Sequence, residues 1–139
     1  MDLILVLVAA AVALAILGLG VWGIMRFFVR RTGWGRLVEL YPASHIPKQL
    51  YGFCFGQING FGHGRSLNVG MDPDGLYVEW VWGFAKPVFI PWTYVNTFRE
   101  ETFSPGRASI QVLVNDLEML LHVPREAEEH VPASVVRAN

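Results

Sequence analysis

The feature that most constrains this chain is its first apolar segment, which carries no charged residue from Leu3 to Met25. A helix rises about 1.5 Å per residue, so a run of this length covers the roughly 30 Å hydrocarbon core of a bilayer. The backbone must be helical there because unpaired amides and carbonyls are too costly in lipid. The sequence therefore predicts a transmembrane anchor that, with the basic residues following it, occupies residues 1–31.

Basic residues gather at one end of this segment and predict how it crosses the membrane. Arg26, Arg30, Arg31 and Arg36 follow the apolar run, whereas only Asp2 and the amino terminus precede it. The positive-inside rule then places the N-terminus outside and the rest of the chain in the cytoplasm, as a single-pass membrane protein. The four arginines predict contact with anionic lipid headgroups; the simpler interpretation is that they only set the topology.

A cleaved signal peptide is the alternative interpretation of the same segment. Such peptides usually have a basic start and a shorter apolar core, whereas Met1-Asp2, the segment before the apolar run here, is acidic and the run is long. We therefore expect the segment to stay as an anchor.

Small residues line two faces of the predicted helix. Ala11, Ala15 and Gly18 share one face, and Ala9, Ala13 and Gly20 share another. Small faces let helices approach closely, and packing drives helix association in lipid. We predict helix packing through Ala11, Ala15 and Gly18; the alternative is that alanine and glycine simply fill the span.

Residues 32–49 predict a short helix and a linker. The Thr32–Gly35 segment is rich in glycine and predicts a break after the anchor. A short amphipathic helix follows over residues 36–41, with Leu37, Leu40 and Tyr41 on one face. Pro42 and Pro47 end it and form the linker.

From Leu50 onward the apolar period changes to two, which predicts strands. Seven strands are expected, separated by turns such as Asn59-Gly60 and by Asn115-Asp116, which closes the clearest hairpin. They lie at 51–57, 66–71, 76–82, 87–92, 94–103, 108–114 and 118–123. The fold class is thus one transmembrane helix plus a mainly antiparallel β-domain over residues 50–125, a partly open barrel or a sandwich. An acidic tail over residues 126–139 is expected to form a helical turn or two and then fray.

One predicted strand face is more apolar than a solvated face should be. Tyr77, Val81 and Phe89 lie on the side where polar residues are expected, with Phe84 at the intervening turn. Contiguous apolar area of this kind marks an interaction site, so these four residues predict a partner-docking surface. Burial inside the domain, under the helix at 36–41, is the competing explanation.

At these residues a family resemblance can be recognised. The succession Asp74-Gly75-Leu76-Tyr77-Val78, followed by Phe89-Ile90-Pro91-Trp92 and Val95, resembles bacterial pleckstrin-homology-like domains. The chain is also similar to small bacterial membrane proteins that join one span to such a domain. The resemblance covers about residues 67–123 and implies a partly open barrel with a scaffold or binding role. The long C-terminal helix usual in that family is not evident.

The residue patterns argue against catalysis and against bound cofactors or metals. The lone cysteine, Cys54, lies between two phenylalanines and predicts a buried apolar side chain. No two histidines or cysteines have metal-ligand spacing, and the glycines from Gly60 to Gly64 lack the lysine of a phosphate-binding loop. Glu100 and Glu101 are adjacent on a predicted strand and so face opposite sides. The net charge of −1 gives no indication of a nucleic-acid partner.

Two functions are favoured, and an enzyme whose site is built from scattered residues stays open as a third. The first is a non-catalytic accessory or scaffold subunit that binds other integral membrane subunits of a larger bacterial inner-membrane complex through its helix and the Tyr77 face. The second is a membrane-tethered module that binds lipid headgroups or a peptide through Arg65 and His63, or through Lys86.

Overall fold

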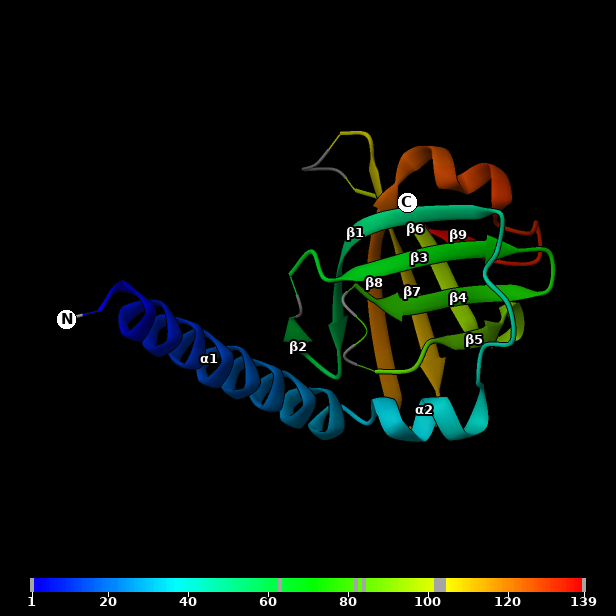
Figure 1. Ribbon diagram of the computed structural model, residues 1–139. Helices are drawn as coiled ribbons and strands as arrows, with labels where there is room; N and C mark the ends of the chain where they lie inside the picture. The colour runs from blue at the N-terminus through cyan, green and yellow to red at the C-terminus, as the bar shows by residue number, and fades with distance from the viewer. Residues whose placement is uncertain (1, 63, 82, 84, 102–104, 139) are drawn as a thin grey trace.

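A computed structural model describes residues 2–62, 64–81, 83, 85–101 and 105–138 of the chain (Figure 1). Two helices open it. Helix α1 spans Leu3–Arg31, and helix α2 spans Trp34–Leu40. Between them Gly33 has a φ of 87°, a conformation that glycine adopts without strain and that ends α1. The predicted break between anchor and short helix is confirmed.

The β-domain is a curled sheet whose strands follow the predicted positions. In the described residues nine strands are present: β1 (Gln49–Ile58), β2 (Phe61–Gly62), β3 (Leu67–Asp72), β4 (Gly75–Trp80), β5 (Val88–Pro91), β6 (Val95–Glu100), β7 (Arg107–Val114), β8 (Leu117–Pro124) and β9 (Val136–Ala138). Their order is β5-β4-β3-β1-β8-β7-β6-β9, with β2 paired to β1. The sheet curls into a half-barrel around one apolar core (Figure 1).

Two features of the sheet differ from the prediction. Strands β2 and β9 were not expected, because both are too short to show a period. The sheet is also mixed rather than antiparallel, since β9 pairs with β6 in parallel. The predicted hairpin of β7 and β8 is confirmed, with Val114 opposite Leu117.

Helix α2 closes one end of the half-barrel (Figure 1). Trp34 is buried, its indole nitrogen donates to the carbonyl of Lys86 at 2.8 Å, and its ring packs edge-on against Trp80. Leu37 is buried beside it, whereas Leu40 stays exposed. The expected apolar face of α2 is thus rotated toward Trp34. Trp34 and Leu37 are three positions apart and so lie on one face of the helix.

The linker after α2 covers the strand face expected to dock a partner. Tyr41 accepts a backbone hydrogen bond from Phe89, and Ala43 donates one to Pro87. Pro47 is buried against Gly70. Under this cover Tyr77 is only 1% exposed. The competing explanation of burial within the domain is therefore the correct one for Tyr77, although the linker, and not α2, provides the cover.

The C-terminal residues belong to the folded domain instead of fraying. A 3-10 helix, η2 (Arg125–His130), lies over the end of the barrel opposite α2 (Figure 1). Ala127, Val131 and Val135 are buried in the core, and β9 follows. The sequence did not predict this burial, because the three buried residues are spaced four positions apart among acidic residues and show no strand period.

Candidate functional site

Helix α1 has an apolar surface that the rest of the chain leaves uncovered. Val29 is the one buried residue in it, and leucine, isoleucine and valine side chains are exposed along its whole length. Among the described residues it is the one helix long and apolar enough to cross a membrane. Signal sequences share that length and composition.

The residues expected at the membrane surface and in helix packing lie along α1 and α2. Arg26, Arg30, Arg31 and Arg36 are all exposed. The guanidinium carbon of Arg26 lies 4.7 Å from the Trp22 ring centre. Ala11, Ala15 and Gly18 are exposed, and a Cβ added to Gly18 would meet nothing within 4 Å. These helix positions are open to another molecule.

The connection between α1 and the domain is a buried elbow. Thr32 is 1% exposed, and its hydroxyl donates to the carbonyl of Val29 at 2.6 Å. The Asn59 amide donates to the Thr32 carbonyl at 3.1 Å, and its side-chain oxygen accepts from the backbone of Glu118 at 2.9 Å. Asn59 and Gly60 both have positive φ, as a two-residue hairpin turn requires. This turn joins the end of α1 to the β-domain.

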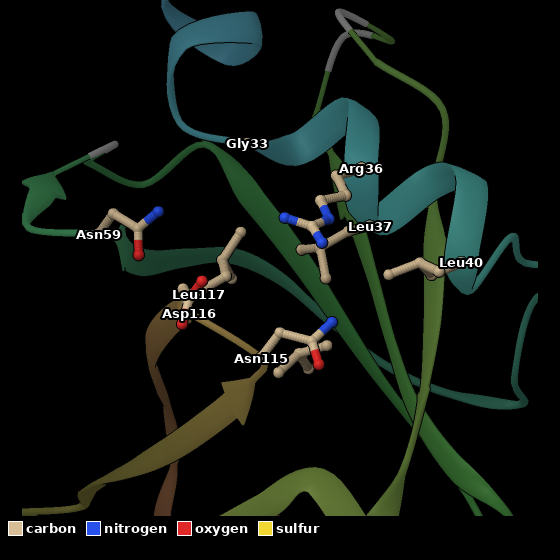
Figure 2. A pocket seen from close by; sticks show the side chains of 9 residues that line it. Gly33, Arg36, Leu37, Leu40, Asn59, Asn115, Asp116 and Leu117 are labelled. Carbon is tan, nitrogen blue, oxygen red and sulfur yellow. The ribbon is translucent and has the colours of Figure 1, made fainter.

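Beside the elbow lies a pocket of about 120 Å³ between α2 and the β7–β8 turn (Figure 2). Its apolar wall comes from Leu37, Leu40 and Leu117. Arg36 and Asp116 add one charge of each sign. Figure 2 shows the side chains of α2 pointing toward the turn across this space. We name it the elbow pocket, and it has the apolar wall and polar rim of a small docking site.

The four residues predicted to dock a partner are not brought together as an open surface. Tyr77 is buried, and its hydroxyl donates to Glu79 at 2.5 Å. Val81 and Phe89 are half-buried, and the ring of His45 lies 5.6 Å from that of Phe89. Phe84 lies outside the described residues. Burial and the bond to Glu79 raise the pKa of Tyr77, so its hydroxyl stays protonated and donating.

A second cluster, which the sequence analysis did not identify, lies where β1 bends. Tyr51 pairs with Val69 and Cys54 with Leu67, so Gly52 and Phe53 together face one residue of β3. This is a β-bulge, and it reverses which side chains point outward. Phe53 and Phe55 are exposed as a result, at 61% and 39%.

Phe53 is held in an unusual backbone conformation. Its φ is 53°, which is rare for a bulky side chain and costs about 1–2 kcal/mol. The side-chain oxygen of Asn68 accepts a hydrogen bond from the backbone amide of Phe53 at 3.2 Å. The side-chain nitrogen of Asn68 donates one to the carboxylate of Glu79 at 2.9 Å. The surrounding polar network therefore keeps a strained, exposed phenylalanine in place, and such strain is concentrated at functional sites.

Two arginines flank the second phenylalanine. The guanidinium carbons of Arg65 and Arg107 lie 5.4 Å and 6.0 Å from the Phe55 ring centre. Within the described part of the chain neither forms an ion pair with a carboxylate. Nearby, His122 and Glu101 contact each other. We name Phe53, Phe55, Arg65 and Arg107 the aromatic–arginine groove; pockets of about 280 Å³ and 370 Å³ open on either side of Phe55.

Among the described residues, the lone cysteine and the acidic and histidine side chains form no metal-binding group. Cys54 is buried as predicted, and burial raises the pKa of its thiol, so it is a poor nucleophile. No three His, Cys, Asp or Glu side chains among the described residues could hold a metal ion. His63 lies outside those residues. Lys86 is exposed but lines neither pocket beside Phe55.

The two phenylalanines of the aromatic–arginine groove could have been found from sequence. Cys54 was expected to be buried, and strand alternation then sends Phe53 and Phe55 outward together. The two arginines could not have been found this way, because they come from the β2–β3 loop and from β7.

Comparisons with known proteins identify no relative from which a role could be transferred. No family model matches the sequence, no curated protein matches it at a significant level, and no solved structure matches the fold at a significant level. The function of this chain is therefore argued from its own helix, pocket and groove.

Proposed function

We propose that this chain is a membrane-anchored, non-catalytic accessory subunit of a larger assembly in a bacterial inner membrane. The observation that carries the proposal is the uncovered apolar surface of α1. The β-domain has a core of its own to which α1 contributes only its last turns. About 30 Å of exposed leucine, isoleucine and valine is costly in water and favourable in hydrocarbon.

We further propose that the domain faces the cytoplasm and is pleckstrin-homology-like. Arg26, Arg30 and Arg31 at the domain end of α1 support the orientation. The curled sheet supports the family, although α2, the helix that closes one end of the barrel here, precedes the strands in the chain.

The elbow pocket is the proposed docking site for a partner subunit. Its first lining residue, Gly33, is two positions beyond the end of α1. A span packed against Ala11, Ala15 and Gly18 leaves the bilayer beside Arg31, so its first residues outside the lipid reach this pocket. The occupant is therefore an apolar side chain of a neighbouring subunit's juxtamembrane segment, seated between Leu40 and Leu117.

Cell fractionation followed by gentle detergent purification tests this function. The full-length chain with a C-terminal tag is expected in the membrane fraction, with residues 1–31 retained in its measured mass. It is expected to co-purify with other integral membrane proteins. A soluble product trimmed at its N-terminus would refute the anchor, and a lone monomer in detergent would refute the accessory role.

Substitution of Leu40 by Asp tests the elbow pocket. Leu40 is 48% exposed, so the domain should fold, but a carboxylate in the pocket opposes an apolar partner side chain. We expect at least about tenfold less partner in the pull-down. Ile46→Asp is the matched control, at an exposed linker residue beside Tyr77. If only Ile46→Asp reduced the partner in the pull-down, the docking site would be the Tyr77 face and not the elbow pocket.

A second candidate function, a membrane-tethered ligand-binding module, is favoured by the placement of Arg65. The structure sets this residue against Phe55 and near Arg107, as part of a groove with two unpaired guanidinium groups among the described residues. This arrangement suits an anionic ligand.

A further inference from the structure

We propose that the aromatic–arginine groove docks onto the surface of the bilayer that α1 crosses, with its arginines on phosphate groups of anionic lipids and its phenylalanines in the headgroup layer. The proposal rests on the proposed anchoring by α1. It deepens the second candidate function by naming both the site and the ligand.

The first step is the position of the groove relative to the membrane end of α1. Asn59, at the end of β1, is hydrogen-bonded to Thr32, which directly follows the arginines of α1. Phe55 is four residues back along β1, a distance of about 13 Å at about 3.3 Å per residue. In Figure 1 the bend of β1 and strand β2 lie on the side of the domain from which α1 leaves. The elbow therefore holds the groove near the headgroup layer.

The second step is that the connection is rigid enough to fix this position. Val29 and Thr32 are buried, and Asn59 bonds to both Thr32 and Glu118. If α1 moved freely relative to the domain, Val29 and Thr32 would be exposed to water and the hydrogen bond from Asn59 to Thr32 would break. The bilayer is accordingly the nearest extensive surface on this side of the domain.

The third step is the chemistry of the groove. Guanidinium groups bind phosphate oxygens through paired hydrogen bonds, and Arg65 and Arg107 have no carboxylate partner among the described residues. Glu101 contributes one negative charge nearby, but it contacts His122. The two arginines thus leave the groove positively charged. Phenylalanine is among the apolar side chains that enter the boundary between headgroups and acyl chains, so the exposed rings of Phe53 and Phe55 suit this layer.

The fourth step is the bulge, which turns Cys54 and Ile58 into the core and leaves the two phenylalanines outside. It places Phe53 at positive φ and exposes its ring. A lipid headgroup layer would cover both exposed rings, and the arginines of α1 already bring the chain to the same layer. Continuity with these arginines favours the bilayer over a separate peptide ligand.

Hydrogen–deuterium exchange of the full-length protein in lipid nanodiscs tests the proposal. Discs of phosphatidylglycerol are compared with discs of phosphatidylcholine. The readout is amide exchange in residues 52–54 of the bulge and 64–66 of the following loop. We expect slower exchange in phosphatidylglycerol, and Arg65→Gln should reduce this protection about fivefold. Arg107→Gln should act in the same direction.

Two further variants separate the groove from general effects. Arg99→Gln removes the same charge from an exposed position on β6 and should leave the protection unchanged. Phe53→Gly relieves the positive φ, so the domain should fold, but it should lose protection. Equal exchange in both lipids, or equal effects of Arg65→Gln and Arg99→Gln, would overturn the proposal.

The same experiment distinguishes the alternatives. Protection by inorganic phosphate in phosphatidylcholine discs would overturn bilayer docking in favour of a free anion site. Failure of the chain to enter the discs would refute the anchor itself. Entry into the discs without lipid-dependent protection would refute the groove proposal alone.

Discussion

Asn59 is the residue that most directly joins the anchor to the domain. Its side chain bonds to the carbonyl that ends α1 and to the backbone that starts β8. Its φ of 51° suits asparagine, which tolerates the left-handed region better than most residues. One residue therefore serves a hairpin turn and an interface between elements.

Replacing Asn59 by Gly tests this role at the level of stability. Glycine keeps the backbone conformation and removes two hydrogen bonds, so we expect the free energy of unfolding to fall by about 1–3 kcal/mol. Urea unfolding in detergent, followed by tryptophan fluorescence, measures it. Asn115→Gly is the matched control, because Asn115 has a φ of 53° and is exposed at the other hairpin turn. A similar loss in both variants would show that turn conformation alone is responsible.

At the scale of elements, the two helices have different roles. Helix α1 presents an exposed apolar surface, and helix α2 closes one end of the half-barrel. The seven residues of α2 are too few to form a stable helix alone. Burial of Trp34 and Leu37 in the core provides the packing that stabilises it. The small face of α1 has no counterpart in the β-domain. Its proposed role is contact with another membrane-spanning helix.

Enlarging Gly18 tests whether α1 packs through that face. Gly18→Ile places a branched side chain where close approach is proposed, so co-purification with membrane partners should fall at least about tenfold. Gly20→Ile is the control on the opposite side of the helix, and it should have little effect. The reverse pattern would assign packing to the face of Ala9, Ala13 and Gly20.

At the scale of the whole molecule, the C-terminal segment completes the core at the edge of the sheet. Strand β9 lies beside β6, and the buried side chains of Ala127, Val131 and Val135 join the central cluster. The ion pair of Arg137 with Glu128 lies at the surface and contributes little. The segment stabilises the domain by its apolar residues and not by its acidic ones.

Val135→Asp tests that statement. A carboxylate buried without a partner should lower the free energy of unfolding by about 3 kcal/mol or more. Glu129→Gln removes an exposed charge of the same segment and should change it by less than about 0.5 kcal/mol. Urea unfolding of the two variants measures the difference. If Val135→Asp unfolded like the unaltered chain, the segment would not be part of the cooperative core.

Local patterns in the sequence were enough to predict the helix at Leu3–Arg31, the short helix after the break, seven strand positions and the burial of Cys54. Each of these depends on a run, a period or a turn within one continuous segment of the chain, so the physical cause is local. The Asn59-Gly60 turn is of the same kind.

Tertiary structure alone decided what covers Tyr77, where Arg65 and Arg107 lie, and that the C-terminal residues join the core. Tyr77 is covered by residues more than thirty positions earlier, and β9 pairs with a strand almost forty positions before it. The bulge at Phe53 reverses the outward face of β1 with one extra residue. Such long-range pairings and shifts of register depend on which segments meet in space, and no local period records that.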